Sequence, residues 1–334
     1  MLINNKVLDE KKVTALITRI KKKKELKEVS SDFVYDCLFD FLQQNPKLVP
    51  MLTDNFNPKS SYYKQIIKEV RARLRKVYGL FRVEEGAKHL RVLVSELLES
   101  GKSKQAGKNK HKELITRILS THASTKERLP FYSQLYKKIF ALTGKPETII
   151  DFGCGINPFS VHFMELKKIT YYAYDISEDE IRSLQLFFKH EHAANKNFTG
   201  RAKVMDVFQW VRLKESRENA PADICFLFKM TDILDSSGKG HKTSGAVIAG
   251  VPAKYVVVSF PTKTMSGKKM NFPRRKWIEL MCARLGYSFW ILEFGNEVFY
   301  VIKKHPNTDS GPNTAPALPH SCRKYSLNPQ TGAL

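Results

Sequence analysis

From residue 147 onward, short apolar runs alternate with longer segments whose apolar residues recur at helical spacing. Apolar runs bounded by turn residues are typical of buried strands, and strands separated by helices indicate parallel β/α units. Only Gly295-Asn296 separates the last two runs, and this dipeptide favours a tight turn between antiparallel strands. The pattern predicts an α/β sheet with strands at residues 147–151, 170–175, 201–205, 222–228, 254–260, 287–294 and 297–303.

The first 110 residues show helical periodicity, interrupted by breaks such as Asn45-Pro46. Three parts are therefore expected: a helical domain over residues 1–110, an α/β domain over 111–304 and a disordered Pro-rich tail over 305–334. Within the first part, helices are expected at residues 13–20, 31–42 with Ser31 as the cap, 62–78 and 83–98, followed by a flexible basic linker at 101–110.

The charge of the chain indicates which class of partner it binds. The formal net charge is +23, and residues 1–110 alone contain 24 Lys and Arg against 13 Asp and Glu. An excess of this size favours a polyanionic partner, with nucleic acid ahead of an acidic membrane because no basic segment has a continuous apolar face. A solubilising surface is the alternative. On the predicted helix at 62–78, the cations expected opposite the apolar stripe are Lys64, Lys68, Arg71, Arg73, Arg75 and Lys76.

The composition excludes several other classes. No apolar run approaches the length of a spanning helix, and the N-terminus lacks the apolar core of a signal peptide. The five cysteines are scattered and never form C-x-x-C, which favours reduced thiols in a cytoplasm over disulfides or zinc. His190 and His192 lie on one predicted helix without a partner at ligand spacing, so no metal site is expected.

The strongest chemical signal follows the first predicted strand of the sheet. Gly153 and Gly155 allow a tight turn and close approach of a ligand, and Asp175 ends the next strand twenty positions after Gly155. An acidic residue there suits the two hydroxyls of a ribose. Pro158 stands where a dinucleotide fingerprint needs a third glycine, which favours S-adenosylmethionine over a pyrophosphate-containing cofactor. A structural turn without a ligand is the alternative.

Four segments together resemble the aminoglycoside-resistance 16S rRNA guanine-N7 methyltransferases. They are HASTKERLP at 122–130, DFGCGINP at 151–158, VVSFPTKTMSG at 257–267 and GNEV at 295–298. The resemblance covers about residues 112–303, and it departs from the family in the Pro-rich tail and in a shortened loop after Ser266. It implies the class I S-adenosylmethionine-dependent methyltransferase fold, a Rossmann-like, seven-stranded sheet with an antiparallel terminal hairpin, here preceded by the basic helical domain.

The resemblance also implies residues that bind the cofactor. Arg128 would grip its carboxylate, although a salt bridge to a neighbouring helix is the alternative, and residues 124–127 also fit a helix capping box with Pro130 in an early helical position. Asp206 would contact adenine or cap the next helix, and Asn157 is expected to be a cap. The full expected set is Arg128, Asp151, Gly153, Gly155, Asp175, Asp206 and Val207.

For the base pocket, the resemblance implies Lys229, Lys263 and Glu297, with Lys268 nearest to the family's loop arginine. Glu297 could accept from the Watson–Crick edge of guanine, or it could be an exposed turn carboxylate. N7 of neutral guanine carries a free lone pair, so no general base is required. The expected enzyme is a 16S rRNA (guanine(1405)-N(7))-methyltransferase-like protein that acts as a cytoplasmic monomer on 16S rRNA in the 30S subunit.

Aminoglycosides would be involved only indirectly, through resistance of the modified subunit. Two alternatives stay open: a methyltransferase acting on another rRNA or tRNA base, and an inactive RNA-binding protein of the same fold.

Overall fold

The computed structural model describes residues 2–3, 6–78, 86–100, 107–207, 222–235, 241–263, 268–270 and 274–305. Most of the expected linker at 101–110 and all but the first residue of the expected tail at 305–334 lie outside these ranges. Residues 107–110, which were assigned to the linker, belong to helix α6 (Gly107–Leu119). The amphipathic pattern of α6 starts further along the chain, which is why its first turn was mistaken for linker.

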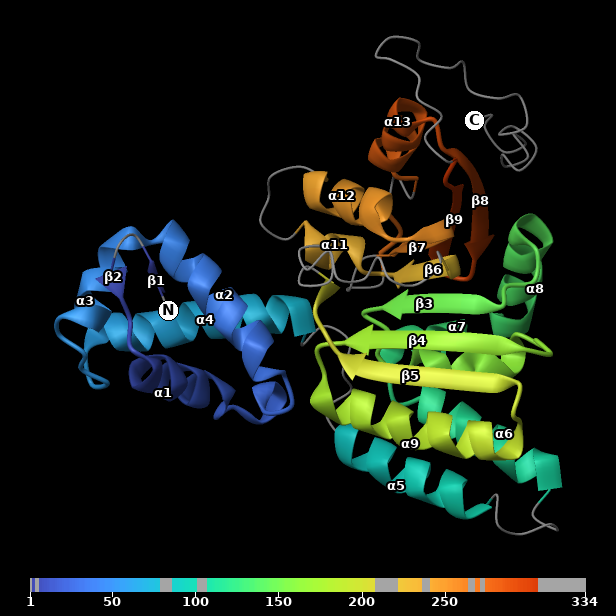
Figure 1. Cartoon of the computed structure of the whole chain (residues 1–334), viewed down its shortest axis with the longest axis horizontal. Helices are drawn as coiled ribbons and strands as arrows, with labels where there is room; N and C mark the ends of the chain where they lie inside the picture. Colours follow the sequence, from blue (N-terminus) through green and yellow to red (C-terminus); the bar gives the residue numbers. More distant parts are fainter. Residues whose placement is uncertain are drawn as a thin grey trace.

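A seven-stranded sheet forms the centre of the larger part of the molecule (Figure 1). The strand order is β5-β4-β3-β6-β7-β9-β8, and β9 pairs antiparallel with both β7 and β8. This confirms the predicted α/β fold with its antiparallel hairpin. The strands are β3 (Thr148–Phe152), β4 (Ile169–Asp175), β5 (Phe198–Val204), β6 (Ala222–Phe228), β7 (Ala253–Pro261), β8 (Ser288–Phe294) and β9 (Glu297–Lys303).

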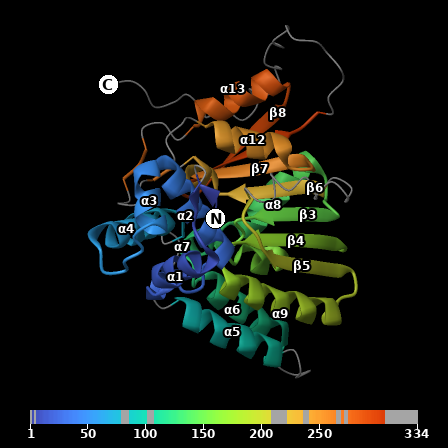
Figure 2. The same cartoon turned by 60° about the vertical axis from the view of Figure 1, so that its left-hand side comes forward.

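Two helical layers cover the sheet (Figures 1 and 2). One face packs against α8 (Tyr132–Thr143), η3 (Asn157–Phe163) and α9 (Glu178–Ala194), with α5 (Gly86–Ser100) and α6 in the same apolar core. The other face packs against α11 (Thr231–Leu234), α12 (Lys242–Gly250) and α13 (Lys276–Leu285). Burial on both faces explains why the central strands are continuous apolar runs.

Strand order reverses between β3 and β6, which are parallel neighbours in the sheet. From β3 the chain continues outward to β4 on one side, whereas from β6 it continues outward to β7 on the other side. In open parallel sheets, ligands bind at the carboxyl edge next to such a switch point. The Gly153–Gly155 turn follows β3 at this edge, and Lys229 follows β6. The topology therefore brings two of the predicted site segments to one edge.

A separate helical unit precedes the sheet. A two-stranded hairpin, β1 (Leu2–Ile3) and β2 (Lys6–Val7), was not predicted. The unit has its own apolar core, to which Leu16, Leu38 and Ile66 contribute. Its helices are α1 (Glu10–Lys21), η1 (Lys24–Leu26), α2 (Ser31–Gln44), η2 (Pro46–Leu48), α3 (Val49–Thr53) and α4 (Ser61–Tyr78).

Two sequence-based expectations for the N-terminal region change. The cap of α2 is Ser30, whose Oγ accepts from Phe33 N at 3.1 Å, whereas Ser31 is already helical. In addition, α5 and α6 share the core of the sheet and not that of α1–α4. We therefore propose a domain boundary between α4 and α5 in place of the expected one after residue 110.

The N-terminal unit contacts the carboxyl edge of the sheet directly, as both views show (Figures 1 and 2). Ser30 N donates to Ile176 O at 2.9 Å, and Glu178 N donates to Glu28 O at 3.0 Å. These contacts join the start of α2 to the segment between β4 and α9. The helical unit is thereby fixed immediately beside Asp175.

Among the described residues, no helix is both long and apolar enough to cross a membrane. Four cysteines, Cys37, Cys154, Cys225 and Cys282, are free thiols in the described ranges, and Cys322 lies outside them. Burial raises the pKa of Cys37 to about 12 and that of Cys154 well above its usual value. These two thiols are therefore protonated and unreactive at neutral pH.

Candidate active site at the carboxyl edge of the sheet

The turn after β3 is held open by its glycines. Gly153 and Gly155 have φ values of 60° and 49°, a left-handed conformation that glycine adopts without strain. A β-carbon at position 153 would collide with the side chain of Met230, which follows β6. The backbone of the turn therefore lies directly beside a flexible thioether, in a space where a ligand could replace the Met230 side chain.

Asp175 fixes this turn from the end of β4. Its Oδ2 accepts from Gly155 N at 2.9 Å, and its Oδ1 accepts from Ser177 N at 2.9 Å. An ionised carboxylate offers about four acceptor positions, so two remain for hydroxyl donors. Burial and the charge of Glu180 raise the pKa of Asp175 to about 6, while the two backbone donors act to lower it.

Asp151 is only 1% exposed, and its expected contact to a cofactor stays a prediction. Its Oδ2 accepts from Asn157 Nδ2 at 2.9 Å and from the Tyr171 hydroxyl at 2.8 Å. Burial raises the pKa of Asp151 to about 7, against the hydrogen bonds, which lower it. Asn157 is also no cap: it is the first residue of η3, and its Oδ1 accepts from the Tyr132 hydroxyl at 2.9 Å.

A buried pair behind the glycine turn was missed in the sequence. His122 Nε2 lies 3.3 Å from Glu180 Oε1, and both side chains are less than a tenth exposed. A β-carbon at Gly155 would lie 3.5 Å from His122 Nδ1 and 3.7 Å from Glu180 Oε2. This pair therefore supports the Gly155 turn from behind. His122 opens the HASTKERLP segment, but Glu180 belongs to no recognised motif.

The helix of that segment, α7 (Ala123–Arg128), is not capped as expected. His122 is its N-cap residue without a side-chain hydrogen bond, so residues 124–127 do not form a capping box. Thr125 Oγ1 instead donates to Leu119 O at 2.5 Å and to His122 O at 3.2 Å, which ties α7 to the end of α6. Pro130 lies between α7 and α8, one residue before the Phe131 cap.

At the other end of α7, Arg128 is fully buried and bound to Glu297. Its Nε donates to Glu297 Oε2 at 2.9 Å and its Nη2 to Oε1 at 2.8 Å, a bidentate pair between side chains 2% and 0% exposed. The guanidinium also lies over the ring of Phe228, 4.7 Å from its centre. Arg128 thus has a carboxylate partner on β9, not on a neighbouring helix.

Glu297 consequently is neither an exposed turn carboxylate nor open to a base. It starts β9 opposite Pro261, the last residue of β7, so it does lie at the carboxyl edge as expected. Ser259 Oγ also donates to its Oε1. Arg128 donates to both oxygens of Glu297, and the Glu297 side chain is 0% exposed, so neither oxygen is directed to solvent. Breaking this pair would leave a buried arginine without its carboxylate, which would be costly.

Lys229 extends this cluster toward the surface. It has φ 55°, a left-handed conformation rare for a non-glycine residue. Its N–H donates to Ser259 Oγ at 3.0 Å, and its Nζ lies 2.6 Å from Glu127 Oε2 and 3.8 Å from Glu297 Oε2. Only 10% of its side chain is exposed. Backbone strain of this kind is concentrated at functional sites.

The remaining expected residues divide into two groups. Lys263 and Lys268 are exposed, and their loop joins the β8–β9 turn through the hydrogen bond from Thr262 N to Asn296 O at 2.8 Å. Asp206 and Val207 are buried after β5, 9% and 3% exposed. Whether Asp206 caps a following helix concerns residues 208–221, which lie outside the described ranges.

Helix α7 connects the two halves of the site. Its N-cap His122 lies behind the Gly155 turn, and its last residue Arg128 pairs with Glu297. The site therefore combines a turn suited to a nucleoside with a rigid cluster of charged groups that ends in a lysine. Such a site can hold a nucleoside cofactor beside a polar substrate; the cluster has no ionised group free to act as a base.

Comparison with known proteins places this geometry in context. A family model described as ribosomal RNA methyltransferase (FmrO) matches residues 59–301. A 16S rRNA (guanine(1405)-N(7))-methyltransferase of Proteus mirabilis is 26% identical over 271 residues, covering 77% of this chain and 89% of that protein. A protein of the same name from Micromonospora rosea is 31% identical over 192 residues, covering 56% of this chain and 65% of its own.

Among solved structures, the 16S rRNA methyltransferase RmtF in complex with S-adenosyl-L-homocysteine has a TM-score of 0.66 at 22% identity. The 16S rRNA methylase RmtB has a TM-score of 0.63 at 22% identity. Each likeness covers 90% of this chain and 100% of the other, which supports the common fold. Because the family model matches well over half of the chain, this protein belongs to the FmrO family of ribosomal RNA methyltransferases.

Proposed function

We propose that this protein transfers the methyl group of S-adenosylmethionine to N7 of a guanine in the decoding site of 16S rRNA, within the 30S subunit. This proposal rests mainly on one observation. Helix α7 connects the glycine turn, which Asp175 holds in place, to the cluster of Arg128, Glu297 and Lys229 at the same edge of the sheet. Relatives in the same family are named 16S rRNA (guanine(1405)-N(7))-methyltransferases, which supports the choice of base and atom.

The residues of the turn fit the cofactor. The cofactor would displace the Met230 side chain from the space over Gly153, and Asp175 keeps two acceptor positions that suit the ribose hydroxyls. We still assign Arg128 to the carboxylate of the cofactor, but through a different part of its guanidinium. Nε and Nη2 are taken by Glu297, so the Nη1 side of the guanidinium is the part that would donate. The cofactor supplies the sulfonium methyl group.

The chain's own residues must orient the base and exclude water. N7 attacks through its free lone pair, so no proton has to be removed, and the base must first leave its stack. We assign Glu297 a positioning role, because Arg128 and Ser259 occupy its oxygens. Lys229 can donate to guanine O6, the acceptor adjacent to N7, and so fix that edge without blocking N7.

The exposed Lys263 and Lys268 lie at the same edge of the sheet and suit the phosphates on either side of the extruded base. They carry positive charge without a burial cost, whereas Lys229 is held in place by Glu127. We therefore separate a rigid lysine that orients the base from two exposed lysines that contact the backbone.

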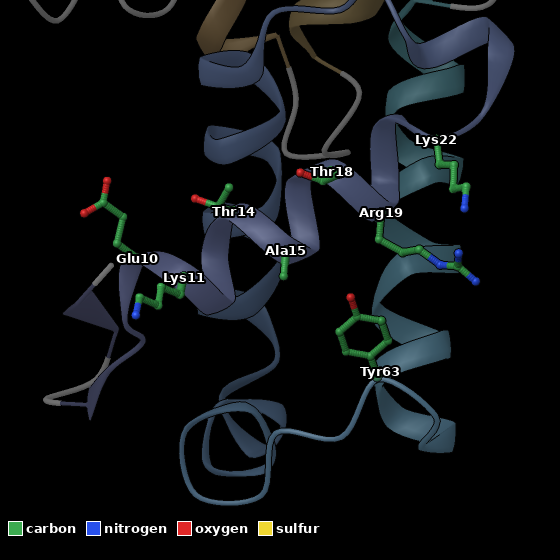
Figure 3. A pocket seen from close by; sticks show the side chains of 8 residues that line it. All are labelled: Glu10, Lys11, Thr14, Ala15, Thr18, Arg19, Lys22 and Tyr63. Atoms are coloured by element: carbon green, nitrogen blue, oxygen red, sulfur yellow. The ribbon is translucent and has the colours of Figure 1, made fainter.

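For docking on RNA we propose a groove along α1 (Figure 3). It has a volume of about 690 Å³ and is lined by Glu10, Lys11, Thr14, Ala15, Thr18, Arg19, Lys22 and Tyr63. The three cations among them are exposed. Basic side chains, hydroxyl groups and an aromatic ring together suit contacts to phosphate and ribose.

The cations expected on α4 opposite its apolar stripe, which could also have formed an RNA-docking face, have partners of their own in part. Arg71 Nε donates to Ile20 O at 3.1 Å at the end of α1, and Arg75 pairs with Glu25 at 2.7 Å. Arg73 donates to Gln44 Oε1 at 2.9 Å. These three arginines therefore stabilise the helical unit, while Lys64 and Lys68 are exposed and the side chain of Lys76 lies outside the described residues.

A methyl-transfer assay tests the proposal. Purified 30S subunits, 50S subunits and protein-free 16S rRNA are each incubated with the enzyme and tritiated S-adenosylmethionine. The expected result is about one methyl group per 30S subunit, much less on protein-free rRNA and none on 50S subunits. Equal labelling of 50S subunits, or no labelling of any RNA by protein that binds the cofactor, would refute the proposed substrate.

A further inference from the structure

Three segments far apart in the sequence bring two imidazoles and a carboxylate together. His111 comes from the first turns of α6, His162 from η3 and Glu191 from the end of α9. Their ligand atoms all lie within 4.8 Å of one another. Spacing along the chain gives no indication of such a group, and for this reason a metal site was not expected from the sequence.

The distances within this cluster suit a tetrahedral ion. His111 Nε2 lies 3.2 Å from His162 Nε2, His162 Nε2 lies 3.4 Å from Glu191 Oε2, and His111 Nε2 lies 3.8 Å from Glu191 Oε1. Zinc bonds of about 2.0–2.2 Å to nitrogen and oxygen place neighbouring ligand atoms of a tetrahedron about 3.4 Å apart. The two imidazole nitrogens thus already have nearly the separation of two corners, and each lies within 3.8 Å of a carboxylate oxygen of Glu191.

Charge gives an independent reason for a cation. Glu191 is 8% exposed, and within the described part of the chain its ion pairs are all to histidines. A divalent ion would add positive charge directly beside this buried carboxylate.

A further histidine supports the arrangement. His190 Nδ1 lies 3.4 Å from Glu191 Oε1, and its ring stacks near that of His111 with centres 6.2 Å apart. Groups of this kind around a metal ligand fix the orientation of the carboxylate. His190 therefore completes a histidine-rich surround for the one acidic ligand.

We propose that His111, His162 and Glu191 bind a divalent transition-metal ion of the zinc type, with water as the fourth ligand. The ion would clamp α6 to η3 and α9. The cluster is remote from the reaction: Glu191 lies thirteen residues beyond the start of α9, about 20 Å along its axis from the carboxyl edge. The metal accordingly has a structural role, and this inference does not rest on the proposed function.

The test uses full-length protein without a histidine tag, stripped of metal by a chelator. Zn²⁺ chloride is then titrated in competition with a chromophoric chelator. The expected result is one tight equivalent of Zn²⁺, weakened at least about 100-fold in His162→Gln and in Glu191→Gln, since losing a ligand should cost at least as much as losing its supporting partner. His89→Gln, which changes an exposed histidine on α5, should bind like the wild type.

Two further readouts keep the result independent of folding defects. Zn²⁺ at 100 times its dissociation constant should raise the thermal midpoint of the wild type by about 5 °C and that of His162→Gln by less than about 1 °C. Co²⁺ in place of zinc should give tetrahedral visible bands without a thiolate charge-transfer band. Zinc affinity unchanged in both ligand variants, or a thiolate band, would overturn the proposed site.

Discussion

Asp175 holds the glycine turn through two backbone amides, and in the proposed function it also accepts from the ribose of the cofactor. Its partly buried position raises its pKa to about 6, so it is ionised at neutral pH but lies close to protonation. Asp151, only a few residues from the turn, has a pKa of about 7 for the same reason of burial. We therefore expect ligand binding at the glycine turn, the proposed nucleoside site, to depend on pH just below neutrality.

Asp175→Ala should weaken the binding of S-adenosylhomocysteine at least about tenfold, since each hydrogen bond to a charged acceptor contributes about 1.5–3 kcal/mol. In the wild type, lowering the pH from 7 to 5 protonates Asp175 and should weaken binding by about tenfold. Isothermal calorimetry measures both effects. Asp151 also titrates in this range, so the variant is the control: a pH dependence in Asp175→Ala as steep as in wild type would exclude Asp175.

Glu297→Ala should destabilise the protein by about 3–5 kcal/mol, because it leaves the Arg128 guanidinium buried without its carboxylate. The matched control is Glu127→Ala, which removes the other carboxylate beside Lys229. Its side chain is 40% exposed, so the expected cost is below about 1 kcal/mol. Urea unfolding of both variants measures the difference. A similar loss in the free energy of unfolding for both variants would show that the buried Arg128–Glu297 pair does not stabilise the protein to this extent.

At the level of helices and strands, periodicity predicted the sheet closely because buried strands are continuous apolar runs. The predicted hairpin at 287–294 and 297–303 differs from β8 and β9 by one residue. Caps and short elements were less predictable, since Ser30 and Ser31 are both acceptable caps by residue type. The His122–Glu180 pair and the Arg128–Glu297 pair were not foreseen, because each joins segments that only the tertiary fold brings together.

The α1 groove makes a prediction for RNA docking. Replacing Lys11, Arg19 and Lys22 together by Glu should weaken 30S binding steeply at low salt, and the salt dependence should fall by somewhat under one unit for each lost phosphate contact. The matched control replaces Lys145, Lys167 and Lys196 together by Glu. These three exposed lysines precede β3, β4 and β5, at the edge of the sheet opposite to its carboxyl edge. Equal salt slopes for the two triple variants would rule out the groove as the docking surface.

For the whole molecule, the sequence established the fold, the cofactor class and the basic character of the N-terminal unit, because each depends on local pattern or composition. It placed the boundary between domains after residue 110, whereas the packing groups α5 and α6 with the sheet. The contact of Ser30 and Glu28 in the N-terminal unit with the segment after Asp175 could not be predicted from the sequence either. This contact places the proposed RNA-docking unit directly beside Asp175 and the glycine turn proposed to bind the cofactor.

The most direct test of the proposed activity is the identity of the modified nucleoside. 30S subunits are treated with the enzyme and S-adenosylmethionine, and their 16S rRNA is digested and analysed by mass spectrometry, with borohydride–aniline cleavage to locate the base. We expect one 7-methylguanosine per subunit, in the decoding site, and none with Asp175→Ala enzyme at limiting cofactor. A methyl group on another atom or another base, with no 7-methylguanosine formed, would contradict the proposed function.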